Sequence, residues 1–351
     1  MAANQKIAVV LMNLGGPDKT ESIRPFLKNF FMDKNIIAAP YPVRWMISRL
    51  IAWRRGRGEA LTAYSALGGG SPLLANTELQ RTALERSLQK DYGDYIRCFI
   101  SMRYWHPMAA ETVQKIKAYA PDKLILLPLY PQFSTTTVFS SLEDWQKAAR
   151  KSGLDVPTAS FGCYPFQTGF IEASADLISH EWRKLPAGHK TRLLFSAHGL
   201  PEKIIEGGDP YQWQCEESAR RIAAATGIEN LDWQICYQSR VGPLKWIGPS
   251  TEEALDKAAA DNVGVLVYPH AFVSEHVETL VEIEEEYREY AMERGVPHFT
   301  RVPTVMTHPK FIVGLKGMVL ENLDKTGVIS GAPCPQNFEK CCRRLAEKGA
   351  L

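Results

Sequence analysis

Short, continuously apolar runs recur along the chain, and stretches with helical periodicity lie between them. A strand that is covered on both faces has no side exposed to water, so such runs are typical of parallel sheets. Each helical stretch follows one of these runs or a turn, which is the order of β-α units. The expected strands are residues 6–13, 95–101, 123–127, 192–197, 233–237 and 263–268, and the expected helices are residues 73–89, 109–118, 215–225, 250–259 and 277–293.

The strand-like runs form two series of three, separated by the segment 162–190. This arrangement favours an α/β fold with two doubly wound parallel sheets over a single barrel. In open parallel sheets, ligands bind beyond the carboxyl ends of the strands. We therefore expect a cleft between two domains whose polar lining comes from the residues that follow each strand.

His198 is one of these strand-end residues. It follows an apolar strand and precedes Gly199, which allows another part of the backbone to approach closely. An imidazole there could serve in proton transfer or metal binding, because its ordinary pKa is near neutral pH. A histidine at a strand end is also often a purely structural group, so His198 by itself leaves both interpretations open.

A series of acidic residues lies in the expected helix that follows the last strand. Glu275, Glu278, Glu282 and Glu286 are spaced three, four and four residues apart, which places them on one stripe of an α-helix. Like charges at this spacing each destabilise an isolated helix by about 0.2 to 0.5 kcal/mol, and a bound cation would remove that cost. Oxygen ligands of this kind suit a divalent metal in transit, whereas a solvated acidic face is the alternative interpretation.

Residues 42–57 form a basic segment in which five arginines border large apolar side chains. A buried helix would not carry so many charges. Such a segment is typical of a helix that lies on a membrane surface or lines the mouth of an apolar ligand pocket. An interface with a partner protein is the alternative.

Composition restricts the function classes. Of the 351 residues, 45% are hydrophobic and 23% are charged, as in ordinary soluble domains. The 41 Lys and Arg residues nearly balance the 39 Asp and Glu residues, so the chain has no global positive field that would hold nucleic acid. No apolar run reaches the roughly 20 residues that cross a bilayer, and the first residues lack signal-peptide anatomy. We therefore expect a cytoplasmic protein.

The seven cysteines are an odd number for a disulfide framework in a reducing compartment. Cys334, Cys341 and Cys342 fall within nine residues near the end of the chain. Clustered thiols suggest an iron–sulfur or zinc site, which needs a fourth ligand. Cys163, near the expected domain junction, is the candidate for that ligand. Free thiols are the remaining interpretation.

Several motifs together resemble the ferrochelatase family, from residue 6 to residue 323. The resemblance implies two Rossmann-like domains of the chelatase type, at residues 1–161 and 162–302. It also implies a helical segment, residues 303–330, that returns to the first domain and is followed by a cysteine-containing tail, residues 331–351. The motifs are Asn13-Leu14-Gly15-Gly16-Pro17, Leu67-Gly68-Gly69-Gly70-Ser71-Pro72, Phe195-Ser196-Ala197-His198-Gly199-Leu200-Pro201, Tyr237-Gln238-Ser239-Arg240-Val241-Gly242-Pro243 through Trp246, and Ser274-Glu275-His276-Val277-Glu278-Thr279-Leu280.

The resemblance also implies an activity, namely that of a lyase that inserts ferrous iron into protoporphyrin IX as the last step of haem biosynthesis. The family's catalytic histidine falls on His198 and its essential glutamate on Glu278. These two residues, with Glu282, Glu286 and His276, match the positions that handle the metal. The family's substrate-binding positions fall on Arg54, Arg55, Tyr64, Arg103, Tyr104 and Trp246.

The expected chemistry agrees with these residue types. Metallation removes two pyrrole protons and requires weak oxygen or nitrogen ligands that release the iron, which suits an imidazole and a row of carboxylates. A haem carrier would share the aromatic pocket but would not need the base, and a periplasmic metal-binding protein would need a signal peptide.

The resemblance also bears on cofactor and partners. Animal members of the family have a cluster cysteine at the position where this chain has Thr135. A [2Fe-2S] cluster here would therefore take Cys163, Cys334, Cys341 and Cys342. Besides the porphyrin and ferrous iron, the expected partners are the anionic surface of the inner membrane and a second copy of the chain in a homodimer.

Overall fold

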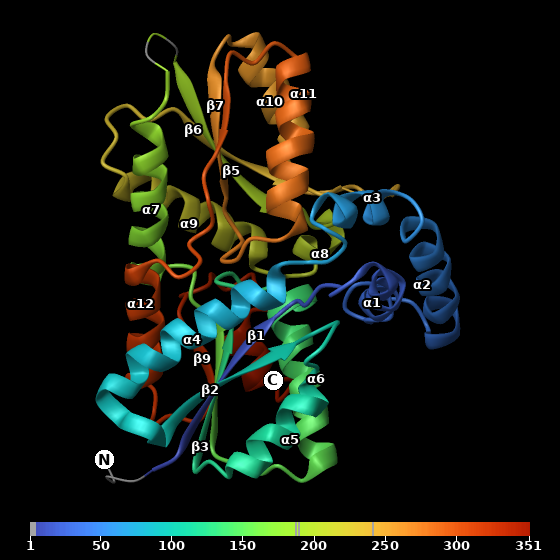
Figure 1. Ribbon diagram of the computed structural model, residues 1–351, viewed down its shortest axis with the longest axis vertical. Helices are drawn as coiled ribbons and strands as arrows, with labels where there is room; N and C mark the ends of the chain where they lie inside the picture. Colours follow the sequence, from blue (N-terminus) through green and yellow to red (C-terminus); the bar gives the residue numbers. More distant parts are fainter. Residues whose placement is uncertain (1–4, 187, 189, 241) are drawn as a thin grey trace. The chain divides into compact units, whose positions relative to one another are not determined.

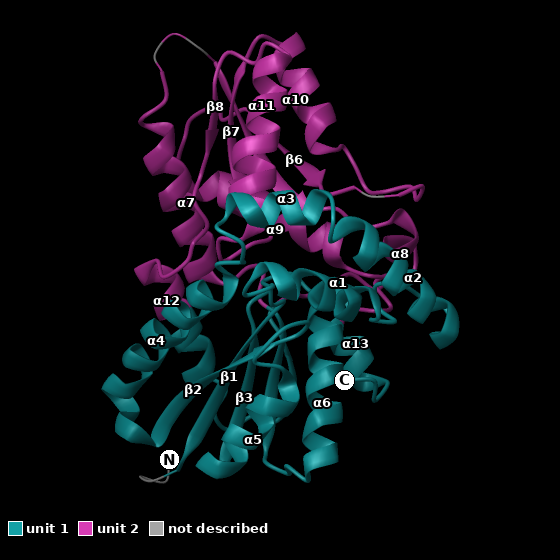
Figure 2. Ribbon diagram, turned by 45° about the vertical axis from the view of Figure 1, so that its right-hand side comes forward, with its two compact units in different colours: residues 1–163, 315–331, 342–351 teal, residues 164–314, 332–341 magenta. Residues whose placement is uncertain are grey.

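The computed structural model describes residues 5–186, 188, 190–240 and 242–351, and is shown in Figure 1. The chain forms two compact units, which Figure 2 distinguishes by colour. Unit 1 comprises Met1–Cys163, Leu315–Gly331 and Cys342–Leu351, and unit 2 comprises Tyr164–Gly314 and Ala332–Cys341.

Unit 1 is built on a five-stranded parallel sheet in the order β2-β1-β3-β4-β9. The strand β1, which lies between β2 and β3, is buried along its whole length because helices lie on both sides of the sheet (Figure 1). Its register pairs Asn13 with Met102, so both strand ends reach the same edge. The strands are β1 (Ile7–Asn13), β2 (Ile96–Met102), β3 (Lys123–Pro128), β4 (Thr158–Cys163) and β9 (Gly327–Ser330).

The helices of unit 1 pack against this sheet or extend beyond it. The two longest are α4, which packs on β2, and α2, which carries the arginine-rich segment. The helix α12 (Pro309–Leu320) starts in unit 2 and belongs to unit 1 from Leu315. Besides α12, the helices are α1 (Ile23–Phe31), α2 (Tyr41–Arg55), α3 (Glu59–Ala66), α4 (Leu73–Tyr92), α5 (Ala109–Tyr119), a π-helix (Thr135–Phe139), α6 (Ser140–Ser152) and α13 (Cys342–Glu347).

Unit 2 has a four-stranded parallel sheet in the order β6-β5-β7-β8. Its core combines apolar residues of the sheet, such as Leu194 and Val265, with residues of the helices that cover it, such as Leu255 and Ile283. The strands are β5 (Thr191–His198), β6 (Trp233–Gln238), β7 (Gly264–Pro269) and β8 (Phe299–Arg301). The helices are α7 (Thr168–Trp182), α8 (Glu202–Glu206), α9 (Tyr211–Ala225), α10 (Thr251–Ala260), a π-helix (Glu278–Tyr287) and α11 (Arg288–Glu293).

The predicted fold class, with two parallel α/β sheets, is confirmed, and so is each of the six predicted strands. Three strands, β4, β8 and β9, were not predicted from the sequence. Strands β8 and β9 are only 3 and 4 residues long, and β4 has a glycine and polar residues where a buried run would be apolar. They are strands because partners distant in sequence pair with them.

For one predicted helix, the type of helix was wrong. The segment 277–293 was expected to be α-helical, but its first part, Glu278–Tyr287, is a π-helix that continues into α11. Backbone hydrogen bonds in a π-helix join residues five apart, so the side chains face other directions than in an α-helix. Among the described residues, no helix is both long and apolar enough to cross a membrane.

Candidate active site

The carboxyl end of β5 and the start of the π-helix bring His198 and Glu278 together in unit 2. Nδ1 of His198 lies 2.9 Å from Oε2 of Glu278. Both side chains are partly accessible, with 36% of His198 and 22% of Glu278 exposed. The two residues predicted as the catalytic pair, 80 positions apart, are thus hydrogen-bonded at the edge of a parallel sheet where a ligand is expected.

The electrostatics of the pair favour a charged imidazole. Burial acts to lower the pKa of His198, but the attraction and hydrogen bond of Glu278 raise it above the ordinary value. When the ring is neutral with its proton on Nδ1, that N–H donates to the carboxylate and Nε2 is left as an acceptor. The Glu278 carboxylate then stabilises the imidazolium that forms when Nε2 takes up a proton.

Glu282 is held beside this pair by three side chains. The Ser239 hydroxyl lies 2.9 and 2.7 Å from its two carboxylate oxygens, and Nε2 of Gln238 donates to Oε2 at 3.1 Å. The Tyr287 hydroxyl donates to Oε1 at 3.2 Å. Burial and the nearby negative charge of Glu278 raise the pKa of Glu282 to about 7. This carboxylate can therefore take up or release a proton near neutral pH.

The π-helix explains how Glu282 and Tyr287 meet. They are five residues apart, which is the hydrogen-bonding interval of this helix type. In an α-helix, residues five apart would lie on different faces, so the two side chains would not meet there. Since π-helical turns are frequent at functional sites, their presence here agrees with a chemical role for the segment.

Ser239 reaches Glu282 from a strained backbone. Its φ of 64° lies in the left-handed region, which costs a residue with a side chain about 1–2 kcal/mol. Ser239 and Gln238 were noted at a strand end but were not among the predicted site residues. Their position directly after an apolar strand was the signal that could have identified them, whereas nothing in the sequence marked Tyr287.

The other two predicted metal residues differ strongly in exposure. His276 is buried, and its Nδ1 lies 3.1 Å from the carbonyl oxygen of Ser274, so this nitrogen carries the proton. Its Nε2 lies 3.9 Å from Oε2 of Glu278, and burial lowers the pKa of His276. Glu286 is exposed to solvent. Exposure thus decreases from Glu286 to the partly buried Glu282 and Glu278.

Trp246 lies beside the histidine strand. A Cβ added to Gly199 would come within 3.3 Å of the Trp246 ring and 2.9 Å of the Gln238 carbonyl oxygen. Only glycine therefore lets both groups approach the residue that follows His198. This result places Trp246 beside the residue that follows His198.

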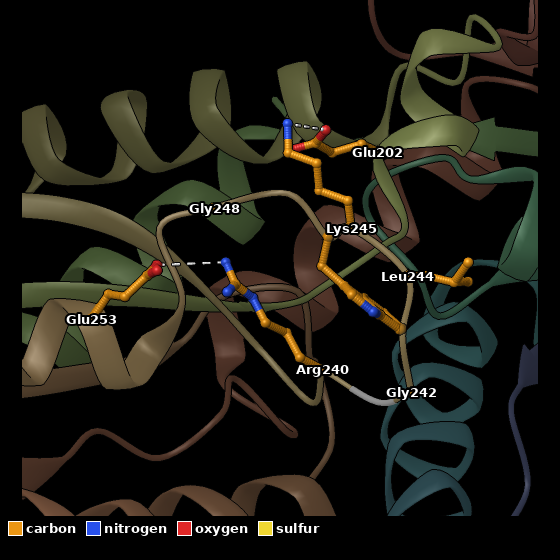
Figure 3. Close-up of a pocket in the computed structure, with 8 residues that line it drawn as sticks. Glu202, Arg240, Gly242, Leu244, Lys245, Gly248 and Glu253 are labelled. Carbon is orange, nitrogen blue, oxygen red and sulfur yellow. Dashed lines mark ion pairs between the residues drawn. The ribbon is translucent and has the colours of Figure 1, made fainter.

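Trp246 also lines a pocket of about 520 Å³ in unit 2 (Figure 3). Two ion pairs border it: Arg240 lies 3.5 Å from Glu253, and Lys245 lies 2.8 Å from Glu202. The lining is Glu202, Arg240, Gly242, Leu244, Lys245, Trp246, Gly248 and Glu253.

Arg103 and Tyr104 form a polar cluster in unit 1, at the end of β2. Nη2 of Arg103 lies 2.9 Å from Asp33, and the Tyr104 hydroxyl donates to the same carboxylate oxygen at 2.7 Å. Ser140 accepts a hydrogen bond from Nε of Arg103 at 2.7 Å. Burial would raise the pKa of Asp33, but the Arg103 guanidinium holds it below the ordinary value. Tyr104 is fully buried, so its ring has a packing role in this structure.

The remaining predicted substrate residues lie on α2 and α3. Tyr64 is buried, Arg54 is exposed and Arg55 lies 3.4 Å from Glu59. The predicted basic segment is helical and strongly exposed. Its guanidinium groups stack on its tryptophans, with Arg49 at 3.8 Å from the Trp45 ring centre. The exposed apolar side chains of α2 are Tyr41, Val43, Trp45, Met46, Leu50 and Trp53.

The four predicted cluster cysteines are all buried. In unit 1, the sulfur atoms of Cys163 and Cys342 lie 3.8 Å apart, and the hydrogen bond from Cys163 is the main cause that lowers the pKa of Cys342 to about 7. In unit 2, the Cys334 sulfur accepts a hydrogen bond from Gln214 at 3.2 Å. Across the part of the chain that the structure describes, no three or more His, Cys, Asp and Glu residues form a group that could hold a metal ion.

Comparison with known proteins gives consistent matches over nearly the whole chain. The family model described as Ferrochelatase matches residues 6–323. A ferrochelatase of Caulobacter vibrioides (strain NA1000 / CB15N) is 49% identical over 348 residues, covering 97% of this chain and 99% of that protein. A ferrochelatase of Hyphomonas neptunium is 47% identical over 345 residues, covering 96% of this chain and 94% of its own.

Among solved structures, SirB from Bacillus subtilis with Fe3+ has a similar fold. It aligns with a TM-score of 0.53 and 10% identity, covering 91% of this chain and 96% of its own. At this identity the likeness concerns the fold alone, and it agrees with the two parallel-sheet units of the chelatase type.

Proposed function

The chain belongs to the ferrochelatase family, and we propose that it catalyses the reaction for which the family is named. The enzyme is a metal-chelating lyase that inserts ferrous iron into protoporphyrin IX, which yields protohaem and two protons. This reaction is the last step of haem biosynthesis. Iron and porphyrin are therefore both substrates.

The hydrogen bond between His198 and Glu278 is the observation that carries the mechanism. Nε2 of His198 accepts one pyrrole proton, and the Glu278 carboxylate on the opposite ring nitrogen stabilises the resulting imidazolium. Glu282, whose pKa is about 7, accepts the second proton. The two protons released by the ring thus have two acceptors in one cluster.

The same carboxylates suit the handling of iron. A ferrous ion must lose water and then leave its protein ligands for the ring nitrogens, so its ligands need to be weak oxygen and nitrogen donors. We assign this transfer to the exposed Glu286, the intermediate Glu282 and the inner pair of Glu278 and His198. His276 presents its Nε2 toward Glu278 and completes the set.

Porphyrin binding is assigned to six residues. Aromatic rings supply apolar contact with the macrocycle, and guanidinium groups can pair with its carboxylate side chains. The exposed Arg54 and half-buried Arg55 suit such pairing. Arg103 already forms an ion pair with Asp33, so we assign it to positioning the residues around it. The six are Arg54, Arg55, Tyr64, Arg103, Tyr104 and Trp246, of which Tyr104 is fully buried and would contribute by packing.

The activity is tested by an anaerobic assay with ferrous iron and protoporphyrin IX, followed by absorbance. A chelatase converts the porphyrin spectrum into the metalloporphyrin spectrum over many turnovers. A haem or porphyrin carrier would shift the spectrum only in proportion to the protein present, and that result would reject the proposal. A parallel assay with coproporphyrin determines which propionate pattern the enzyme prefers.

Attachment to the cytoplasmic face of the inner membrane is the second part of the proposal. The exposed apolar side chains of α2 and its arginines together suit an anionic lipid surface, where each basic residue contributes about 1 kcal/mol. Leu50→Glu should abolish flotation with phosphatidylglycerol vesicles, and Leu79→Glu, on the similarly exposed α4 position, should not. If α2 is instead buried in a homodimer, Leu50→Glu should convert the dimer to monomers.

A [2Fe-2S] cluster on Cys163, Cys334, Cys341 and Cys342 is the third part. The observation that supports it is the separation of 3.8 Å between Cys163 and Cys342, because sulfur atoms on one tetrahedral metal at bonds of about 2.3 Å are about 3.8 Å apart. When bound, the cluster would supply one-electron chemistry, which metallation does not need.

Purified protein tests the cluster directly. We expect a reddish-brown preparation that contains iron and sulfide, loses visible absorbance with dithionite and becomes colourless in Cys163→Ser. Cys98→Ser, which changes a buried strand cysteine outside the set, should keep the colour. A colourless preparation with zinc or with free thiols would reject the cluster.

A further inference from the structure

Arg301, the last residue of β8, contacts two glutamates on either side of Glu278 in the sequence. Its Nη1 lies 3.0 Å from Oε1 of Glu275, and its Nε lies 2.8 Å from Oε2 of Glu284. Only 12% of the Arg301 side chain is exposed. We propose that Arg301 is a positioning residue that holds the Glu278 carboxylate against His198 by fixing both ends of this segment. The inference rests on the proposed function and deepens it.

The contact at Glu275 reaches the residue next to Glu278. Oε2 of Glu275 accepts a hydrogen bond from the Thr279 hydroxyl at 2.6 Å, and Oε1 accepts one from the Thr304 N–H at 2.9 Å. Thr279 is fully buried, and its hydroxyl oxygen also accepts the His276 N–H at 3.0 Å. The Glu275 carboxylate thus connects Arg301 to the side chain of Thr279, the residue after Glu278, and through that hydroxyl to the His276 N–H, two residues before Glu278.

The contact at Glu284 fixes the middle of the π-helix. Arg301 binds one of its carboxylate oxygens, and Arg288 forms an ion pair with the other. Arg288 also donates to the carbonyl oxygen of Phe299 at 2.7 Å, so this side of the helix is tied to β8. Glu284 is therefore anchored to the sheet, six residues after Glu278.

The contacts of Arg301 with Glu275 and Glu284 can stabilise the π-helical conformation. Such helices are rare because their hydrogen bonding is less favourable than that of an α-helix, so a long one needs external support. If the segment Glu278–Tyr287 relaxed towards α-helical hydrogen bonding, side chains five residues apart would separate. The Tyr287 contact with Glu282 would be lost, and Glu278 would rotate away from His198. One planar guanidinium can bind two carboxylates at once, which a lysine ammonium cannot do with the same geometry.

The test compares kcat and KM of Arg301→Gln and Arg301→Lys with those of the wild type. A misplacement of about 1 Å can lower the rate about 100-fold, so we expect kcat of Arg301→Gln to fall about 10- to 100-fold. Porphyrin KM should stay within about twofold, because Arg301 is largely buried and is not one of the residues assigned to the porphyrin. Arg301→Lys should recover part of the loss. Arg294→Gln, which removes the exposed ion pair with Asp256, is the control and should keep wild-type kinetics.

Thr279→Val keeps the test decisive if Arg301→Gln does not fold. It removes the hydroxyl link to Glu275 and leaves every charge in place, and it should lower kcat at least about fivefold by the same misplacement. Wild-type kcat in Arg301→Lys and Thr279→Val, or a loss that appears only in porphyrin KM, would overturn the inference. A wild-type enzyme without turnover would reject the proposed function, and the inference with it. Normal wild-type turnover together with unaffected variants rejects the inference alone.

Discussion

His198 and His270 follow neighbouring parallel strands of unit 2, yet their imidazoles have opposite properties. His198 ends β5, is partly exposed and has a pKa that Glu278 raises. His270 directly follows β7 and is fully buried, and burial lowers its pKa to about 4. The same position relative to a sheet thus gives one ring that accepts a proton readily and one that stays neutral.

The neighbours of each ring explain the difference. Nε2 of His270 lies 2.9 Å from the Cys215 carbonyl oxygen and 2.9 Å from the Ser218 hydroxyl, both of which are neutral groups on α9. Its Nδ1 is buried and has no hydrogen-bond partner in the described structure. His198 instead faces a carboxylate at 2.9 Å. A strand-end histidine therefore becomes a candidate base only when a charged partner from another element stabilises its protonated form.

The largest expected difference between the two histidines concerns turnover. His198→Ala should lower kcat by about 10²- to 10⁴-fold, the usual contribution of a general base, and should leave porphyrin binding intact. His270→Gln, which can still donate to the Cys215 carbonyl, should keep kcat within about threefold. Anaerobic metallation assays and porphyrin fluorescence titrations measure both quantities. An equal loss of kcat in the two variants would contradict a specific catalytic role for His198.

Removing the charged partner should make His198 more similar to His270. In Glu278→Gln we expect the pKa of His198 to fall, because the attraction that raises it is gone and burial remains. We expect kcat to fall about 100-fold, since the imidazolium loses its counter-charge. An NMR titration of the His198 ring gives the pKa, and the assay gives kcat. An unchanged pKa would show that Glu278 is not the cause of the shift.

His270 should affect the free energy of unfolding, whereas His198 should affect turnover. The folded protein keeps His270 neutral down to about pH 4, whereas the unfolded chain takes up this proton near pH 6.5. Stability should therefore decrease as the pH falls from 7, by about 2 kcal/mol at pH 5 from this residue alone. Chemical denaturation at pH 5 and pH 7 should show a smaller decrease in His270→Gln. His180→Gln, at an exposed site, is the control and should behave like the wild type.

The smallest expected effect concerns Glu282, the second proton acceptor. Its carboxyl is protonated below about pH 7, so the rate of the wild type should rise with pH through this value. Glu282→Gln should lower kcat about tenfold and remove that rise, since an amide does not titrate there. Measuring kcat between pH 6 and pH 8 in both proteins tests this. A rise that persists in the variant would assign it to another group.

Much of the fold followed from local pattern. The six predicted strands were recognisable because a strand that is buried on both faces must be apolar along its length. His198, at a strand end, followed from the rule that parallel strands present their carboxyl ends at one edge. Glu278 was identified from its motif, which lies within a few residues and needs no knowledge of contacts.

What the sequence alone determined is therefore the set of strands, the fold class and the motif residues, since each depends on neighbours in the chain. Only the tertiary structure decided that Glu278–Tyr287 is a π-helix, that Glu282 meets Tyr287, and that Arg301 joins Glu275 to Glu284. It also decided in which strand-end histidine the surroundings raise the pKa and in which they lower it. Those features arise from contacts between distant elements, and their energies are set by burial and by charges that local periodicity does not contain.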